Sequence, residues 1–374
     1  MNSIELFSGA GGLALGIHLG GFQHQLIVES DDDAFETLRV NVDRESVPGV
    51  RNWPLVHAKV ESVDLGHYAE VDLLAAGIPC QPFSNGGKRR GFEDDRNMFP
   101  IFSQSVAIIR PRAFLLENVN GLINGRLADH MEYVALQLSM PECQPGRRQT
   151  WRDHLEQLRR RPSNATTYEV KWQVVNAADY GVPQTRKRVF IVGLRKDLGV
   201  TWNFPVRTHS REALVYAQSI SNAYWSQRRM SPPQVPHVGH MRRGAMLGAN
   251  LMPWRTVRDA IEDLPEPRSS PKGDALHTLT PGARSYPGHT GSYIDWPAKS
   301  LKAGVHGVGG GENALRDAQD HLRYFTMREC ARLQTFPDSW TFHGTRSSVT
   351  RQLGNAVPVT LVKIVARSIK VALA

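Results

Sequence analysis

Residues 3–13 read Ser-Ile-Glu-Leu-Phe-Ser-Gly-Ala-Gly-Gly-Leu, a short apolar run that passes into a glycine-rich turn. We predict a strand over Ser3–Phe7. Apolar residues then recur at helical spacing, which predicts a helix over Gly9–Gly20, and the apolar run Gln25–Glu29 predicts a second strand. A strand, a glycine turn, a helix and another strand are the opening of an alternating α/β fold.

The same alternation continues through the first two-thirds of the chain. Val71–Ala76 and Ala113–Glu117 are near-continuous apolar runs, which is typical of strands buried on both faces of a parallel sheet. Tyr168–Val175 alternates in a β manner and Val189–Val192 follows a basic turn, so we expect an antiparallel hairpin at the sheet edge. The sequence therefore predicts an α/β fold with a mostly parallel sheet covered by helices on both faces.

Residues 200–325 have a different composition, with 11 of the 23 prolines, 7 of the 14 histidines and few long periodic runs. We predict a smaller, loop-rich domain there, and a return to a helix after Pro358, where apolar residues recur at helical spacing. The large domain would then comprise residues 1–199 and 326–374. The tryptophans expected in the core of the small domain are Trp202, Trp225, Trp254 and Trp296.

Composition excludes several classes of protein. The 374 residues include 45 Lys and Arg against 36 Asp and Glu, a net charge of +9 that suggests a polyanionic partner. No apolar run of about eighteen residues and no leader segment is evident, so we expect a cytoplasmic protein without a membrane span. Cys80, Cys143 and Cys330 are too far apart for a zinc pair, and the HxxH of His237 and His240 lacks a third ligand. We therefore expect no metal.

The glycine turn and Glu29 form a pattern that is typical of nucleotide-binding α/β units. Glycines let a ligand approach the backbone, and the start of the following helix offers free N–H groups. An acid at the tip of the next strand is placed to accept hydrogen bonds from both ribose hydroxyls. The pattern predicts an adenosine-containing cofactor and leaves open whether it is a dinucleotide or S-adenosylmethionine.

Cys80 follows an apolar strand directly, in the sequence Gly77-Ile-Pro-Cys-Gln-Pro-Phe-Ser84. It would therefore lie at the carboxyl edge of the sheet, where folds of this class bind ligands. Flanking prolines stiffen the loop, and the basic residues Lys88, Arg89 and Arg90 would lower the pKa of the thiol. We interpret Cys80 as a nucleophile rather than as a small buried apolar residue.

Two further groups are predicted at the same edge. Glu117 ends the next apolar strand, where a partly desolvated carboxyl group would stay protonated and act as an acid. Arg186 and Arg188 are two residues apart in an extended segment, so they would share one side and suit a carbonyl oxygen or a phosphate.

Taken together, these residues resemble the C5-cytosine DNA methyltransferases of bacterial restriction-modification systems, with the family's motifs in the family's order. The resemblance implies a Rossmann-like catalytic domain that binds S-adenosylmethionine, a target-recognition domain at 200–325, and a C-terminal helix that packs back onto the catalytic domain. The matching segments are ELFSGAGG at 5–12, GIPCQPFS at 77–84, ENV at 117–119, QTRKR at 184–188, RECARLQTFPDSW at 328–340 and GNAVP at 354–358.

The resemblance also implies a mechanism. Cys80 matches the thiolate that adds to C6 of a flipped-out cytosine, and Glu117 matches the acid that protonates N3 and contacts the N4 amino group. Arg188 matches the arginine on O2, with Arg186 in support. Residues 84–96 match the mobile loop that closes over the base. The residues expected to contact DNA are Gln81, Ser84, Lys88, Arg89, Arg90 and Arg96.

S-adenosylmethionine is the implied cofactor and S-adenosylhomocysteine its product. Lys59 stands where the family often has an acid that accepts from the adenine amino group, so we expect backbone groups to recognise adenine. The residues expected to bind the cofactor are Phe7, Ser8, Gly9, Ala10, Gly11, Gly12, Leu13, Glu29, Ser30, Asp31, Val60, Asn355, Ala356 and Val357.

Three alternatives stay open at this point. Related proteins methylate cytosine C5 in tRNA, whereas the Cys80 loop and the large recognition segment favour duplex DNA. A nucleotide-dependent oxidoreductase would leave Cys80, Glu117 and the arginine pair unexplained, and a silent DNA-binding module would not need both Cys80 and Glu117.

We expect a monomer that works at the nucleoid, with a cognate restriction endonuclease as a candidate partner. Residues 141–164 look long for the family, and we hypothesise that Arg159, Arg160 and Arg161 contact the DNA backbone.

Overall fold

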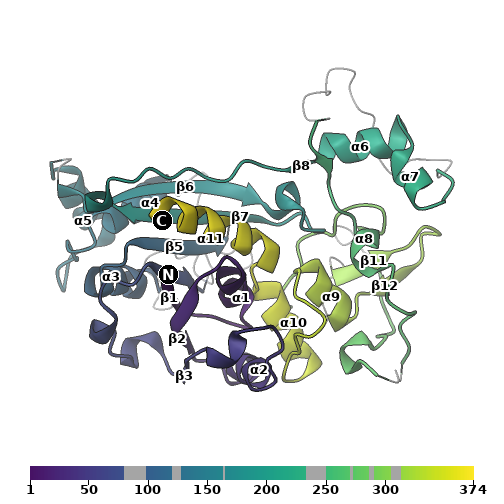
Figure 1. The fold of residues 1–374 in the computed structure, drawn as a ribbon, viewed down its shortest axis with the longest axis horizontal. Coiled ribbons are helices and arrows are strands. Elements are labelled where there is room, and N and C mark those ends of the chain that lie inside the picture. Colours follow the sequence, from purple (N-terminus) through teal and green to yellow (C-terminus); the bar gives the residue numbers. More distant parts are fainter. Residues whose placement is uncertain are drawn as a thin grey trace.

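A seven-stranded sheet organises the protein (Figure 1). The computed structural model describes residues 1–79, 98–119, 128–162, 165–232, 250–269, 273–285, 290–304 and 313–374. The strand order is β3-β2-β1-β4-β5-β7-β6, in which the first five are parallel and β7 runs antiparallel to both neighbours. The strands are β1 (Asn2–Leu6), β2 (Gln23–Glu29), β3 (Leu55–His57), β4 (Leu73–Gly77), β5 (Ala113–Val119), β6 (Tyr168–Asn176) and β7 (Lys187–Arg195).

Helices cover both faces of this sheet, as predicted. In β4, Leu74 and Ala76 pack with α3 and α4, whereas Leu73 and Ala75 pack with α1 and α11. This two-sided burial explains the continuous apolar runs in the sequence. The predicted hairpin is confirmed as β6 and β7, with β6 at the sheet edge. The helices are α1 (Gly12–Leu19), α2 (Asp32–Asp43), α3 (Phe99–Ile109), α4 (Ala128–Ser139), α5 (Trp151–Arg159) and α11 (Val359–Leu373).

The predicted C-terminal helix is α11, which returns to pack on α1 and lies across the sheet in Figure 1. A Cβ atom on Gly16 would lie 2.4 Å from Cβ of Val362, and one on Gly20 would lie 2.8 Å from Cβ of Ala366. The two helices therefore approach each other to a distance that only glycine permits at these positions. This contact joins the two ends of the chain.

Residues 200–325 and the segment that follows contain short elements that lie mostly to the right in Figure 1. β10 and β11 pair in parallel and β12 pairs antiparallel to β11, while β8 and β9 form a separate parallel pair. The elements are α6 (Arg211–Ser219), α7 (Ala223–Gln227), α8 (Arg258–Ile261), β8 (His209–Ser210), β9 (Met252–Pro253), β10 (Ser292–Tyr293), β11 (Ala314–Arg316), β12 (Leu322–Tyr324), α9 (Met327–Leu333) and α10 (Arg346–Asn355).

The apolar side chains of this region belong to more than one hydrophobic cluster. Leu214 and Trp225 belong to a small cluster, to which Trp254 and Trp296 add partly buried faces. Trp202 does not belong there, which corrects our expectation: it packs with α11 in the large core, and its Nε1 donates to Ser368 Oγ at 2.9 Å. The chain passes close to α11 before it reaches the smaller elements, and composition alone gives no sign of that path.

The segment 141–164 contains α5, which packs on α4 through Leu155 and Leu158. Arg159 closes this helix and pairs with Glu132 at 2.6 Å and Glu156 at 2.5 Å. Figure 1 places α5 at the opposite end of the molecule from α6 and α7. Arg159 therefore forms ion pairs within the α4–α5 unit, and the DNA contact of Arg159, Arg160 and Arg161 stays a hypothesis. Of the helices in the described ranges, none is long and apolar enough to cross a membrane.

His24 on β2 links the first two strands to α1. Its Nε2 donates to the carbonyl oxygen of Ala14 at 3.0 Å, and its Nδ1 accepts from Ser3 Oγ at 3.1 Å. This arrangement requires the neutral ring, because a protonated Nδ1 cannot accept a hydrogen bond. Burial lowers the pKa of His24 to about 4, from an ordinary value of 6.5.

We predict that His24 makes the protein lose stability in mild acid. Because its pKa is lower in the folded than in the unfolded state, the unfolded state binds more protons between these two values. The free energy of unfolding then falls by about 3 kcal/mol as pH drops from about 6.5 to about 4. Denaturant titrations of wild type and His24→Gln across this range test this. A constant difference between the two proteins would contradict the prediction.

Candidate active site

A pocket of about 270 Å³ opens at the carboxyl edge of the sheet, where β1, β4 and β5 end. Phe7 follows β1, Gly77 ends β4, and Glu117 lies near the end of β5. The tail completes the pocket through α10 and the residues after it. Sites of this kind form where parallel strands end and diverge, as the sequence predicted.

The turn between β1 and α1 has a conformation that suits a bound ligand. Phe7, Gly9 and Gly11 have φ values of 58°, 54° and 87°, in the left-handed region that non-glycine residues avoid. A Cβ atom on Gly9 would meet no atom within 4 Å, whereas one on Gly11 would lie 2.7 Å from Leu38. Gly11 is the N-cap of α1 and offers no side-chain cap, and Gly12 and Leu13 of the first turn line the pocket. The strained backbone therefore forms a cradle at a helix N-terminus.

Glu29 is fixed beside this cradle. Its Oε2 accepts from Gly9 N at 2.6 Å, and its Oε1 accepts from the backbone N–H groups of Ser30 and Asp31 at 2.8 and 2.7 Å. Three N–H donors hold the carboxylate in one orientation. Oε1 accepts two of these bonds and Oε2 accepts one, so Oε2 retains a lone pair that can accept from a hydroxyl group. The site thus fits the ribose of an adenosine cofactor.

A second hollow, of about 190 Å³, continues from the first past Phe7, Glu29 and Ser30. Val60 is buried in its wall. The pocket has the position and the apolar wall that an adenine ring would need, and Glu61, two residues after Lys59, is an acid in its lining. The sequence pattern did not predict Glu61 and Met98 in this lining. The other residues that line the hollow are Val28, Ala58, Lys59, Glu61, Pro79 and Met98.

The tail wall, residues 355–357, is held against the cradle by close contacts. A Cβ atom on Gly12 would lie 2.6 Å from the carbonyl oxygen of Val357. Fully buried Arg186 donates to the carbonyls of Gly354 and Ala356 at 2.6 and 2.8 Å, and to that of Leu301 at 3.0 Å. Arg186 therefore positions this wall and does not line the pocket itself. The sequence predicted that Arg186 and Arg188 lie on one side of the segment. In the structure Arg186 contacts the tail, whereas Arg188 contacts Glu117.

Glu117 and Arg188 meet at the inner end of the pocket. β5 and β7 run antiparallel, which places Arg188 opposite Val119, and Arg188 Nε lies 3.0 Å from Glu117 Oε1. Only 8% of the Glu117 side chain and 14% of the Arg188 side chain are exposed. Burial raises the pKa of Glu117, and the positive charges of Arg188 and Arg186 oppose that rise. A protonatable carboxyl and a guanidinium thus stand side by side.

The predicted nucleophile and DNA contacts lie outside the described residues. Pro79, which directly precedes Cys80 in the sequence, lines the same pocket as Glu117. Cys330 is buried, and its burial raises the pKa of the thiol, so it is a structural residue. The predicted residues that fall in this undescribed part are Cys80, Gln81, Ser84, Lys88, Arg89, Arg90 and Arg96, together with His237 and His240.

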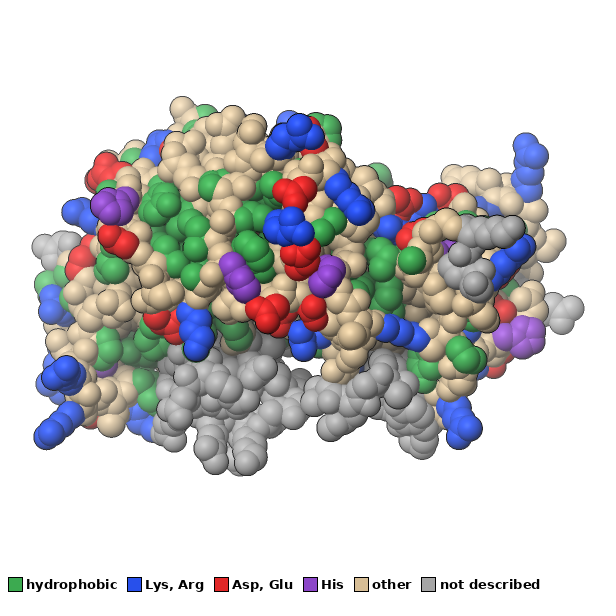
Figure 2. Space-filling model, turned by 90° about the horizontal axis from the view of Figure 1, so that it is seen from below, with side chains coloured by type: hydrophobic (Ala, Val, Ile, Leu, Met, Phe, Trp, Pro, Cys, Tyr) green, Lys and Arg blue, Asp and Glu red, His purple; other side chains and the backbone are tan. Residues whose placement is uncertain are grey.

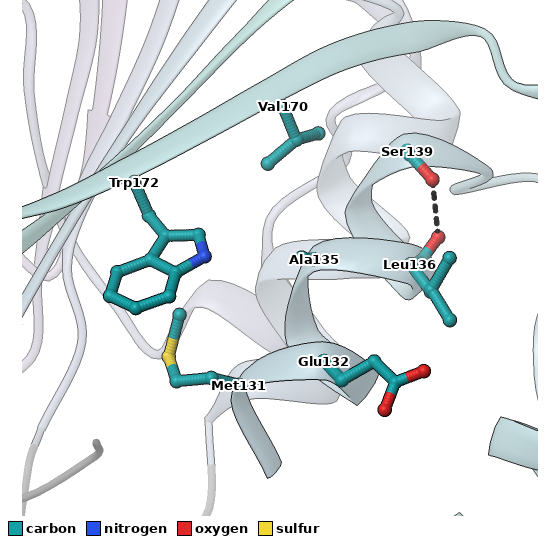
Figure 3. A pocket seen from close by; sticks show the side chains of 7 residues that line it. All are labelled: Met131, Glu132, Ala135, Leu136, Ser139, Val170 and Trp172. Carbon is teal, nitrogen blue, oxygen red and sulfur yellow. Dashed lines mark hydrogen bonds between the residues drawn. The ribbon is translucent and has the colours of Figure 1, made fainter. Parts of the chain in front are cut away.

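Another hollow, of about 560 Å³, lies between α4 and β6 (Figure 3). Trp172 and Met131 face each other across it, the Glu132 carboxylate turns away, and Ser139 Oγ donates to the carbonyl of Leu136. It presents no group that would carry out chemistry. Across the ranges that the structure covers, no cluster of three His, Cys, Asp or Glu side chains is arranged to bind a metal.

The comparisons with known proteins agree with this geometry. The family model "C-5 cytosine-specific DNA methylase" matches residues 1–371. The chain is 32% identical to type II methyltransferase M.Eco47II of Escherichia coli, over 98% of this chain and 78% of that protein. It is 31% identical to type II methyltransferase M.Sau96I of Staphylococcus aureus, over 98% and 75%.

Solved structures confirm the Rossmann-like fold. A putative DNA modification methyltransferase encoded in an E. coli prophage superposes with a TM-score of 0.60 and 20% identity, over 100% of this chain and 99% of that one. The S. pombe Dnmt2 methyltransferase gives 0.58 and 18%, over 100% and 98%. With the family model matched over nearly its whole length, the chain belongs to the C-5 cytosine-specific DNA methylase family and is a DNA (cytosine-5)-methyltransferase.

Proposed function

We propose that this enzyme transfers a methyl group from S-adenosylmethionine to C5 of a cytosine flipped out of duplex DNA. The observation that carries the proposal is the pairing of buried Glu117 with Arg188 at the end of a pocket that continues into the Glu29 cradle. A base at one end and a methyl donor at the other would then share one pocket. The target atom is inaccessible in a stacked duplex, so the base must leave the helix.

Cys80 begins the reaction in this proposal. Its thiolate adds to C6, and the electron pair of the C5–C6 bond moves into the ring, which takes up a proton from Glu117 at N3. C5 of the resulting enamine would then accept the methyl group, with the thioether S-adenosylhomocysteine as the leaving group. Loss of the C5 proton to a base expels the thiolate, and return of the N3 proton to Glu117 restores the neutral aromatic ring. Arg188 holds O2 of the base, and Arg186 supports the site by fixing the tail wall.

S-adenosylmethionine would occupy the cradle and supply an electrophilic methyl on a sulfonium. Glu29 would hold the ribose hydroxyls, the glycine turn would contact the methionine portion with its backbone, and Val60 would pack on adenine. Asn355, Ala356 and Val357 would close the site from the tail. None of these roles requires a metal ion. The observations that support them are the three N–H bonds to Glu29 and the unfilled space at Gly9.

The biological setting we propose is a restriction-modification system. The curated relatives named above are type II methyltransferases, so a restriction endonuclease that recognises the same site is the expected partner. Residues 200–325 would read the target sequence. Action on bacterial DNA would place the enzyme, as a monomer, in the cytoplasm at the nucleoid.

Label transfer tests the substrate. We predict that enzyme given S-adenosylmethionine with a labelled methyl group, unmethylated genomic DNA and bulk tRNA will label 5-methylcytosine in the DNA, and that Cys80→Ser will label neither. Mass spectrometry of the nucleosides identifies the product. Label confined to tRNA would keep the chemistry and reject the DNA substrate. If neither nucleic acid is labelled, even when DNA from several organisms is offered, the proposed activity is rejected.

Glu117→Gln tests the acid. The amide has no proton to give to N3, so we predict that kcat falls roughly 10²- to 10⁴-fold. In wild type, kcat/KM should fall as pH rises through the raised pKa of Glu117, because the protonated fraction disappears. The variant should lack this limb of the profile. Glu156→Gln, an exposed glutamate on α5, is the matched control and should behave as wild type.

A glutamine variant that kept wild-type kcat and the same high-pH limb would contradict this role. Single-turnover kinetics should be used, so that product release does not conceal the chemical step.

A further inference from the structure

Arg351 is a charged residue of the pocket that the sequence analysis did not single out. It lies on α10 four residues before Asn355, so the two side chains leave the same side of the helix, and both residues line the pocket. Its Nη2 lies 3.0 Å from Oδ2 of Asp31, and the two side chains are 50% and 43% exposed. Asp31 also caps α2, because its Oδ1 accepts from Ala34 N at 3.0 Å.

The pocket does not need this ion pair to keep its shape. Its two walls are joined separately: Thr37 Oγ1 donates to Gln352 Oε1 at 2.7 Å, and Trp340 Nε1 donates to the carbonyl of Ala10 at 3.2 Å. Both of these bonds are buried, whereas an ion pair as exposed as Arg351 and Asp31 contributes little net stability. The guanidinium is therefore free to change partners without loss of the fold.

The charges around the pocket match a zwitterion. Among its described lining residues, the acids are Glu29, Asp31 and Glu117, and the cations are Arg188 and Arg351. Arg188 pairs with buried Glu117, which leaves Arg351, half-exposed beside Asp31, as the other cation of the lining. S-adenosylmethionine combines two cationic groups with a single carboxylate, so an acid-rich site with one accessible guanidinium suits it.

The neighbouring surface is less suited to a polyanion. Figure 2 views the molecule from the side of α2 and α10 and shows acidic, basic and histidine side chains intermingled in the middle of that face. His57 Nε2 lies 3.2 Å from Asp32 Oδ1, and His343 Nδ1 lies 3.5 Å from Asp33 Oδ1. Asp31 pairs with Arg351, and Asp32 and Asp33 follow it directly in the sequence, so the negative charge of this segment would repel DNA phosphates.

We propose that Arg351 recognises the carboxylate of the methionine portion of the cofactor, and that this carboxylate replaces Asp31 as its partner. The planar guanidinium fork matches a carboxylate in two-point hydrogen bonding, which a lysine ammonium cannot reproduce. The inference rests on the proposed function, because it assigns a residue to one end of the proposed cofactor. It makes Arg351 a determinant of affinity for the amino-acid end and not for adenosine.

Two ligands distinguish binding of the amino-acid end of the cofactor from binding of its adenosine end. S-adenosylhomocysteine carries the amino acid, whereas 5′-methylthioadenosine keeps the adenosine and the thioether and lacks it. By calorimetry, Arg351→Gln should weaken S-adenosylhomocysteine about tenfold, the scale of one charge-assisted hydrogen bond, and leave 5′-methylthioadenosine unchanged. Arg351→Lys should recover part of the loss. Arg367→Gln, an exposed arginine on α11, is the matched control and should bind both ligands as wild type does.

Asp31→Asn gives a second test with the opposite sign. Asparagine keeps the helix cap but no longer competes as a charge for Arg351, so the affinity for S-adenosylhomocysteine should rise relative to that for 5′-methylthioadenosine. A relative fall would contradict the proposal.

Other outcomes are distinguishable. An equal loss of both ligands in Arg351→Gln would make the residue a wall support, and loss of DNA affinity with unchanged ligand binding would make it a phosphate contact. Either result would overturn the inference. Wild-type protein that binds neither ligand would instead overturn the proposed function on which the inference rests.

Discussion

The close contact between the first and last helices is the constraint on which the rest of the structure depends. Gly16 lets α11 approach until Val362 fills the place of a side chain. That contact brings residues 354–357 over the glycine turn, where Gly12 again leaves room for the carbonyl of Val357. The cofactor pocket consequently has one wall from each end of the chain. Neither wall would enclose the pocket alone.

The reversed strand β7 supplies the second half of the site. Because β7 runs antiparallel between β5 and β6, its first residues reach the edge at which the parallel strands end. Arg188 thereby meets Glu117, while Arg186, just before the strand, turns into the tail and binds its carbonyls. One short basic segment both completes the proposed base end of the pocket and fixes the wall of the proposed cofactor end. The position of the tail wall and the position of the Glu117–Arg188 pair therefore depend on the same segment of the chain.

Much of this was predictable from sequence because it depends on local pattern. Glu29 and Glu117 end apolar strands, and parallel strands bring their carboxyl ends to one edge, so their proximity follows from topology. Arg351 was not predictable, because its partner Asp31 is 320 residues away in sequence and the spacing to Asn355 has meaning only once α10 is placed. The prediction for Trp202 was wrong because its packing also depends on a contact distant in sequence. Composition shows where a loop-rich segment begins, but not which hydrophobic core each side chain joins. The separate surroundings of Arg186 and Arg188 likewise depend on how the tail folds back.

The central claim is that Cys80 adds to C6 of a cytosine that Glu117 and Arg188 hold at N3 and O2, beside the methyl donor. Its most direct test uses a pool of random-sequence duplexes containing 5-fluorocytosine, with S-adenosylmethionine present. Fluorine cannot leave C5 as a proton does, so the covalent enzyme–base adduct should persist. We predict a denaturation-resistant complex whose mass equals protein, DNA strand and one methyl group, with the bond mapped to Cys80. A complete absence of the adduct, or its attachment to another residue, would contradict the account.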